Sequence, residues 1–259
     1  MSKIKKAFEN GSAFIAFLTA GDPTIDKTLD YMKTMEKAGA SLIEVGIPFS
    51  DPIAEGPVIQ EASVRALKNH VSLYDIFKLI KEFRKESQLP LCLMGYLNPI
   101  FKYGYEEFFK KCQEVEIDGV IIPDLPFEEK KEVEDIAVKY QIDVVSLIAP
   151  TSKKRVQMIA REAKGFIYLV SSMGVTGTRT TIDTDLDSII HDIRKVTDVP
   201  VAIGFGIHNQ EQAKSLSQKA DGIIVGSAIV KMIAKDTPST KQDIYDYVSQ
   251  MVRSTKEAI

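Results

Sequence analysis

Short apolar runs alternate with amphipathic segments from one end of the chain to the other. Eight of the runs have the length and composition of strands, and several are apolar at every position rather than at alternate positions. Continuous apolar runs are typical of parallel strands that are covered on both faces. The predicted strands span residues 13–18, 41–46, 91–96, 119–122, 143–148, 165–170, 199–203 and 222–225.

Between these strands, apolar residues recur at helical spacing. The predicted helices span residues 25–37, 73–85, 105–115, 128–140, 153–163, 186–195, 211–218 and 241–255. Strands that are each followed by a helix predict an α/β protein, and eight such units predict a closed (β/α)8, or TIM, barrel. No linker or low-complexity tract divides the chain, so we expect residues 1–259 to form a single barrel domain. An open doubly wound sheet is the main alternative, which the strand count and the chain length disfavour.

The predicted strand 41–46 contains a carboxylate among Leu, Ile and Val, and it leads into a loop rich in proline and glycine. Side chains alternate along a strand, so Leu42, Glu44 and Gly46 point one way, while Ile43 and Val45 point the other. Burial raises the pKa of a carboxyl group toward neutrality, which suits a general acid or base. The alternative is a structural Glu that is paired with a buried Arg or Lys.

Composition and charge exclude several classes of protein. The net charge of -3 and the pI near 5.8 give no basic surface for nucleic acid, and Lys3, Lys5 and Lys6 are interpreted as a solvated helix face. No apolar run is long enough to cross a membrane. Cys92 and Cys112 lie far apart without a CxxC motif or a histidine cluster, so we expect no disulfide, no metal site and a cytoplasmic location.

Glycines follow the last two predicted strands, in Gly204-Phe205-Gly206 and in Gly226-Ser227-Ala228. The loops after strands seven and eight are the usual phosphate position of this barrel, because glycine lets a phosphate approach backbone N–H groups. The segment 174–177 after strand six is a further candidate for this cradle. With no GxxxxGK[ST] motif in the chain, we expect a phosphorylated small molecule rather than a nucleotide.

The residues left for chemistry at the carboxyl ends of the strands are carboxylates and a tyrosine. None of the predicted strands contains a Lys for a Schiff base, and His208 is expected at the entrance to the next helix. The candidates are Glu44, Asp51, Glu55, Asp124 and Tyr168, with apolar surface from Phe17, Ile59, Ile121 and Phe205. Tyr168 shares a strand face with Phe166 and Val170, so it is expected inside the barrel, either catalytic or packed in the core. This set favours acid/base chemistry on a phosphorylated substrate that carries an apolar ring.

Several segments, in order along the chain, resemble the α subunit family of tryptophan synthase: FLTAGDP, IEVGIPFSDPIAEGP, YLVSSMGVTG, GFGI and GSAIV. The resemblance implies a lyase that cleaves indole-3-glycerol phosphate to indole and glyceraldehyde 3-phosphate by a retro-aldol reaction. It implies no cofactor in this chain, and it implies a partner β subunit that carries pyridoxal phosphate, in an α2β2 assembly that passes indole between the subunits.

The resemblance also implies roles for single residues. Glu44 takes the family's acid/base position, Glu55 takes the position of the second catalytic carboxylate, and Tyr168 matches the active-site tyrosine. The phosphate positions are Gly177, Gly206, Gly226 and Ser227, and the indole pocket is Phe17, Ile59, Ile121 and Phe205. The family has Asp where this chain has Glu55, which moves the charge by one methylene, about 1.5 Å, and ~1 Å of misplacement can cost about 10²-fold in rate.

Two loops, 49–58 and 171–185, are expected to be mobile, the second with Arg179 at its middle. Asp51, Pro52, Asn98 and Pro99 resemble the rim that faces the β subunit, or are ordinary turn residues. Three alternatives to a partnered lyase remain open. One is a stand-alone lyase that releases free indole, and another is an impaired or regulatory subunit that binds the substrate without cleaving it. The third is a phosphosugar isomerase on the same barrel.

Overall fold

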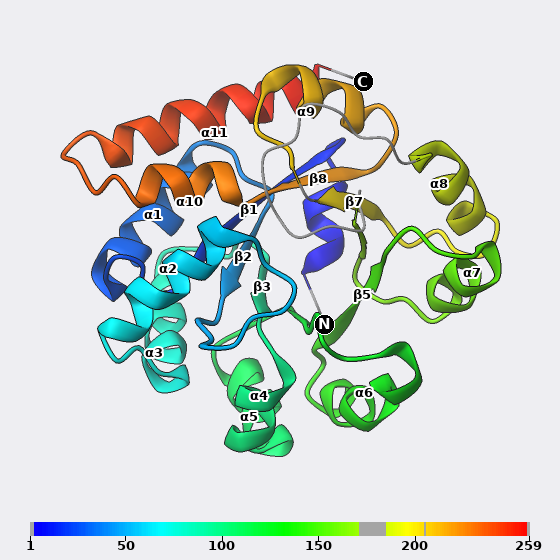
Figure 1. The fold of residues 1–259 in the computed structure, drawn as a ribbon, viewed down its shortest axis with the longest axis horizontal. Coiled ribbons are helices and arrows are strands. Elements are labelled where there is room, and N and C mark those ends of the chain that lie inside the picture. Colours follow the sequence, from blue (N-terminus) through cyan, green and yellow to red (C-terminus); the bar gives the residue numbers. More distant parts are fainter. Residues whose placement is uncertain (1–2, 171–184, 205, 258–259) are drawn as a thin grey trace.

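The computed structural model describes residues 3–170, 185–204 and 206–257, which form a closed barrel of parallel strands surrounded by helices (Figure 1). The strands follow one another around the barrel in chain order, and β1 closes it by pairing with β8. They are β1 (Ala13–Thr19), β2 (Leu42–Gly46), β3 (Leu91–Met94), β4 (Gly119–Ile121), β5 (Asp143–Ile148), β6 (Ile167–Val170), β7 (Val201–Gly204) and β8 (Gly222–Val225). The predicted TIM barrel is therefore confirmed, and the open sheet is excluded.

The helices form the outer layer of the barrel (Figure 1). They are α1 (Ile25–Lys37), α2 (Pro57–Lys68), α3 (Leu73–Phe83), α4 (Leu97–Tyr103), α5 (Tyr105–Glu114), α6 (Lys130–Lys139), α7 (Lys153–Arg161), α8 (Leu186–Arg194), α9 (Gln210–Ser217), α10 (Ser227–Ile233) and α11 (Thr240–Lys256). Two 3₁₀ turns, η1 (Ile4–Phe8) and η2 (Phe127–Glu129), complete the described elements. Among the described residues, no helix has the length and apolar character needed to span a membrane.

Two apolar clusters lie on the two faces of the strands. Ile43 and Val45 belong to the outer cluster, between strands and helices, whereas Leu42 belongs to the inner cluster that fills the barrel. Phe166, Tyr168 and Val170 are also inner residues. The alternation predicted for β2 and β6 is therefore confirmed.

The first turn of the chain closes the amino end of the barrel. Ile4 and Ala7 of η1 are buried in the inner cluster. Lys5 and Lys6 on the same turn are exposed, as predicted for a solvated face. Lys3, by contrast, pairs with Glu116 at 2.7 Å.

A buried ion pair holds the amino ends of β3 and β4 together. Arg84 Nη2 lies 3.2 Å from Asp118 Oδ2, and both side chains are only 5% exposed. The Asp118 carboxylate also accepts the backbone N–H groups of Lys3 and Leu91, at 2.8 and 3.0 Å. Arg84 in turn donates to the carbonyl oxygens of Leu89 and Glu116. The charges of Arg84 and Asp118 thus have both an ionic partner and hydrogen bonds to the backbone. They lie at the amino end of the barrel, opposite the loops predicted to be catalytic.

The sequence analysis missed α2 and α4, which it assigned to loops, whereas a helical turn at η1 was expected from the solvated lysines. The signal for α2 is present in the sequence, because Pro57 occupies its first turn and Ile59, Ala62 and Ala66 recur at helical spacing on its buried face. The predicted loop 49–58 therefore ends where α2 begins.

Candidate active site

Glu44 lies inside the barrel on β2 and is completely buried. In register it sits between Phe17 of β1 and Cys92 of β3. Neither carboxylate oxygen has a hydrogen-bond partner within the part of the chain that the structure describes, and no Lys, Arg or His of that part pairs with it. Burial raises the pKa of Glu44 to about 8. The described residues therefore do not hold Glu44 in a structural ion pair, which was the alternative.

Glycine on β2 makes room for the aromatic ring next to Glu44. A Cβ atom at Gly46 would lie 2.7 Å from Cζ of Phe17, and one at Gly226 would lie 3.2 Å from the same ring. Phe17 thus packs across the top of the barrel against backbone that carries no side chain. Ile59 from α2 and Ile121 at the end of β4 belong to the same inner cluster. Of the predicted indole pocket, these three side chains converge, and Phe205 lies outside the described residues.

Tyr168 enters the barrel from β6, which lies opposite β2 in the closed sheet. Its ring rests against Gly204 of β7, where a Cβ atom would lie 2.5 Å from the phenol oxygen. Burial raises the pKa of Tyr168 well above its usual value, and the carboxylates of Glu44 and Glu55 act in the same direction. The phenol therefore stays protonated and lies within the electrostatic reach of both carboxylates.

Glu55 lies on the loop between β2 and α2 and is half-buried. Its carboxylate accepts a hydrogen bond from the hydroxyl group of Tyr96, the residue that precedes α4. Burial raises the pKa of Glu55, the bond from Tyr96 opposes this effect, and the Asp124 carboxylate after β4 adds to it. Asp51 on the same loop is exposed and contacts its neighbour Ser50.

Tyr96 is the residue of this site that the sequence analysis missed. It follows an apolar run and looked like the end of a strand, whereas the structure ends β3 at Met94. Its position at the carboxyl end of a barrel strand was the available signal.

The predicted phosphate end is described only in part. Gly206 follows β7 with a φ of +87°, a conformation that favours glycine. Gly226 precedes α10, and Ser227 is its first residue, directly after β8. Gly177 and Arg179 lie outside the described residues, as does most of the predicted loop 171–185.

His208 lies just before α9, as expected from the sequence. Its Nδ1 atom is 2.8 Å from the carbonyl oxygen of Gly206, and its backbone N–H donates to Gln212 Oε1 at 3.0 Å. In the described part of the chain, no group of three or more His, Cys, Asp or Glu side chains could hold a metal ion. His208 thus acts in local packing around the turn after β7.

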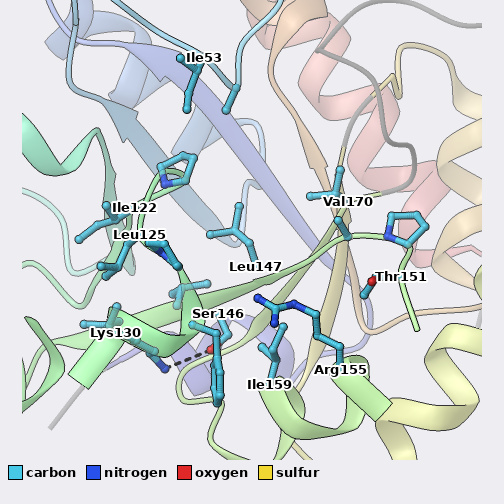
Figure 2. A pocket seen from close by; sticks show the side chains of 18 residues that line it. Ile53, Ile122, Leu125, Lys130, Ser146, Leu147, Thr151, Arg155, Ile159 and Val170 are labelled. Atoms are coloured by element: carbon cyan, nitrogen blue, oxygen red, sulfur yellow. Dashed lines mark hydrogen bonds between the residues drawn. The ribbon is translucent and has the colours of Figure 1, made fainter. Parts of the chain in front are cut away.

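A pocket of about 710 Å³ opens beside the barrel mouth (Figure 2). Leu147 and Val170, which line it, also belong to the rim of the inner cluster, and Ile53 from the Glu55 loop lies above them. At its far side Lys130 donates a hydrogen bond to Ser146 Oγ at 3.1 Å. Apolar surface therefore continues from the barrel interior over the rim formed by β5 and β6.

Comparisons with known proteins agree with this geometry. The sequence model of the family described as tryptophan synthase alpha chain matches residues 2–259. The tryptophan synthase alpha chain of Lacticaseibacillus casei is 45% identical over 251 residues, which are 97% of this chain and 94% of that protein. The alpha chain of Thermoanaerobacter sp. (strain X514) is 46% identical over an alignment of 264 positions that covers 100% of both chains.

Solved structures give the same result. Tryptophan synthase subunit alpha from Legionella pneumophila str. Paris superposes with a TM-score of 0.88 at 33% identity, covering 99% of each chain. A chain from a Pyrococcus furiosus structure, described as that of a tryptophan synthase a2b2 complex and its mutual activation, superposes with a TM-score of 0.87 at 36% identity. That match covers 94% of this chain and 99% of the other. A family match over nearly the whole sequence and full-length relatives of this identity lead to one conclusion: the chain belongs to the tryptophan synthase alpha chain family.

Proposed function

We propose that this chain cleaves indole-3-glycerol phosphate to indole and glyceraldehyde 3-phosphate, by a retro-aldol reaction that uses no cofactor in this chain. The observation that carries the proposal is the Glu44 side chain, which is fully buried and has a pKa of about 8. At neutral pH most of this carboxyl group is protonated, and it can give up its proton at little cost. Those are the properties of a general acid that later acts as a base.

The carbon–carbon bond breaks only after indole C3 has gained a proton. In the proposed mechanism Glu44 donates that proton, and the positive charge that forms is spread over the ring as far as its nitrogen. Glu44, now ionised, takes the proton of the side-chain hydroxyl group. The C3–C1′ bond electrons return to the ring, the aldehyde forms, and Glu44 ends protonated as it began.

The other site residues take roles that follow from their positions. The Glu55 carboxylate stabilises the charge on the ring N–H group, and Tyr168 contacts the substrate between the two carboxylates. Phe17, Ile59 and Ile121, with Phe205, enclose the indole ring. Gly206, Gly226 and Ser227, together with Gly177, bind the phosphate. We place the reaction in the cytoplasm, since Cys92 and Cys112 are both free thiols.

The proposal is tested by incubating the purified chain with indole-3-glycerol phosphate and measuring both products. We expect indole and glyceraldehyde 3-phosphate in equal amounts. Tight binding of the substrate without indole would instead identify a binding subunit. A product with the mass of the substrate would identify an isomerase.

Replacement of Glu55 by Gln is expected to lower kcat about 10²-fold, because a neutral amide no longer stabilises the charge on the ring nitrogen. KM is expected to change less, since the phosphate and the apolar ring supply most of the ground-state binding. Steady-state kinetics on the isolated chain measure both constants. Glu61→Gln, which neutralises an exposed carboxylate on α2, is the matched control. Turnover that survives in the Glu55 variant would remove this residue from the mechanism.

We further propose that the β subunit of tryptophan synthase docks on the carboxyl face of the barrel. Ile53 and Phe101 expose apolar side chains there, 73% and 65% of their surface, on the Glu55 loop and on α4. Asp51, Pro52, Asn98 and Pro99 lie on the same two segments. A partner that covers Ile53 holds the loop that carries Glu55 two residues away.

Addition of the β subunit is therefore expected to raise indole release by at least about fivefold, a typical size for coupling between sites. The measurement compares kcat of the isolated chain with kcat at a saturating concentration of β subunit. An Ile53→Ser variant should need more β subunit for the same activation. Equal rates with and without the partner would contradict the coupling and would indicate a stand-alone lyase.

A further inference from the structure

We propose that Tyr96 is the positioning residue for the second catalytic carboxylate, and that its hydroxyl group adapts the site to Glu55. The inference rests on the proposed function, because it concerns a residue that acts through Glu55.

The Tyr96 hydroxyl group connects three groups of one loop. It donates its proton to the Glu55 carboxylate, and its oxygen accepts the backbone N–H groups of Ile53 and Ala54, at 2.9 and 2.8 Å. The O–H group of the phenol thus donates to Glu55, and its oxygen accepts from the two residues that precede Glu55. A single atom therefore fixes both the path of the loop and the direction of its carboxylate.

The ring of Tyr96 is itself held firmly. It is only 3% exposed and stacks on Phe49, with ring centroids 5.0 Å apart and planes at 28°. The backbone on either side is tied to the barrel, because Gly95 N donates to Ile121 O at 3.0 Å and Leu97 N donates to Asp124 Oδ1 at 2.9 Å. A site residue gains precision when the group that orients it belongs to such a rigid element.

The hydrogen bond from Tyr96 also changes the pKa of Glu55. The Asp124 carboxylate disfavours ionisation of Glu55, as does burial, whereas the bond from Tyr96 favours it. Burial and the Glu55 carboxylate together raise the pKa of Tyr96, so this hydroxyl group keeps its proton throughout the working range. Three side chains thus act on Glu55. Tyr96 is a permanent hydrogen-bond donor, Asp124 is an anion, and Tyr168 is a protonated phenol.

The contact with Tyr96 also gives a reason for Glu at this position. From this loop backbone the longer side chain reaches the hydroxyl group. An Asp on the same backbone would end about 1.5 Å short, a distance that breaks a hydrogen bond and that can lower a rate about 10²-fold. The extra methylene and the tyrosine therefore act as a matched pair.

A double-mutant cycle tests the pair with Tyr96→Phe, Glu55→Asp and the combined variant. We expect Tyr96→Phe to lower kcat by about 10- to 100-fold with KM within about threefold, and Glu55→Asp to lower it to a similar level. Once either partner is gone the contact no longer exists. The combined variant should therefore be no more than about threefold worse than the poorer single variant. The acidic limb of the kcat profile should move to higher pH in Tyr96→Phe, because Glu55 loses the bond that favours its ionised form.

Two controls separate this role from a general effect on the loop. Phe49→Leu removes the ring stack but keeps the hydroxyl group, so it should leave the acidic limb in place. Tyr103→Phe removes a hydroxyl group from the far end of α4, where the ring packs on Phe77 and Phe108, and should leave kcat unchanged. Thermal melts of all variants check that they fold.

Failure of the inference and failure of the proposed function give different results. A wild-type chain that releases indole, with Tyr96→Phe within twofold of it or with fully additive losses in the cycle, would overturn the role of Tyr96 alone. A wild-type chain that releases no indole would overturn the proposed function. The pairing is then measured by NMR titration of the Glu55 carboxyl group, whose pKa must rise in Tyr96→Phe and must not rise in Tyr103→Phe.

Discussion

Replacement of Glu44 by Gln is expected to reduce indole release by at least about 10³-fold and, at the same time, to make the barrel harder to unfold at alkaline pH. Gln has the size and shape of Glu, so the packing around Phe17 and Cys92 is retained. It has no proton to give to indole C3, however, and no base to take one back. General acid–base catalysis contributes about 10² to 10⁴ in rate, and here one group performs both transfers.

The stability effect follows from the pKa of Glu44. In the unfolded chain this carboxyl group ionises near pH 4.5, whereas in the folded chain it ionises only near pH 8. Between these two values the folded state binds the extra proton, so the free energy of unfolding falls as pH rises. The full loss is reached above about pH 8 and is on the order of 5 kcal/mol at most. Glu44→Gln removes this loss.

Urea unfolding at pH 5, 7 and 9, with indole release measured at pH 7, checks both effects. For the wild-type chain, kcat is also expected to decline above about pH 8, where Glu44 loses its proton. Glu61→Gln again serves as the control and should leave kcat and the pH dependence unchanged. Turnover within tenfold of wild type in the Glu44 variant would refute the mechanism, because no other described group occupies the same buried position.

Replacement of Arg84 by Met is expected to destabilise the folded chain by about 3–5 kcal/mol, the usual cost of leaving one member of a buried ion pair without its partner. The Asp118 carboxylate would keep its two backbone donors but lose the opposite charge. The carbonyl oxygens of Leu89 and Glu116 would lose their donors as well. For a chain of this length the change corresponds to a fall in Tm of roughly 10 °C.

Indole release per folded molecule should not change in Arg84→Met, since the ion pair lies at the amino ends of β3 and β4 and the site lies at the carboxyl ends. Lys85→Met is the matched control, because Lys85 is the next residue and pairs with Glu82 on the surface, where both side chains are at least half exposed. That pair is expected to contribute less than about 1 kcal/mol. Equal melting temperatures for the two variants would show that the Arg84–Asp118 ion pair does not stabilise the barrel.

The strands and their facing were predictable because they depend on local pattern. Apolar runs separated by helical periods locate the eight strands to within about two residues at each end. Alternation along a strand places Glu44 and Tyr168 inside the barrel, and the end of β4 places Ile121 there. These features need no knowledge of which other segments lie nearby.

The geometry of Glu55 could not be predicted in the same way. Its carboxylate is placed by Tyr96, which lies 41 residues further along the chain and reaches it only because β2 and β3 are neighbours in the closed sheet. A tyrosine after an apolar run gives no sign of such a contact. The burial of Ile4 was not predicted for a related reason, since it depends on a barrel that the rest of the sequence builds above it.

The short η1 turn contributes to the surroundings of Glu44 from the amino end of the barrel. A Cβ atom at Gly119 would lie 2.8 Å from the side chain of Ile4. Ile4 therefore packs closely against the start of β4 and fills the amino end of the barrel. Leu42 lies two positions before Glu44 on the same strand face, in the same inner apolar cluster as Ile4. Water that entered through the amino end of the barrel would hydrate the Glu44 carboxyl group and lower its pKa toward the usual value of a Glu. Changes to η1 are therefore expected to alter the acidity of Glu44, since Ile4 and Cys92, the register neighbour of Glu44, both pack at Gly119.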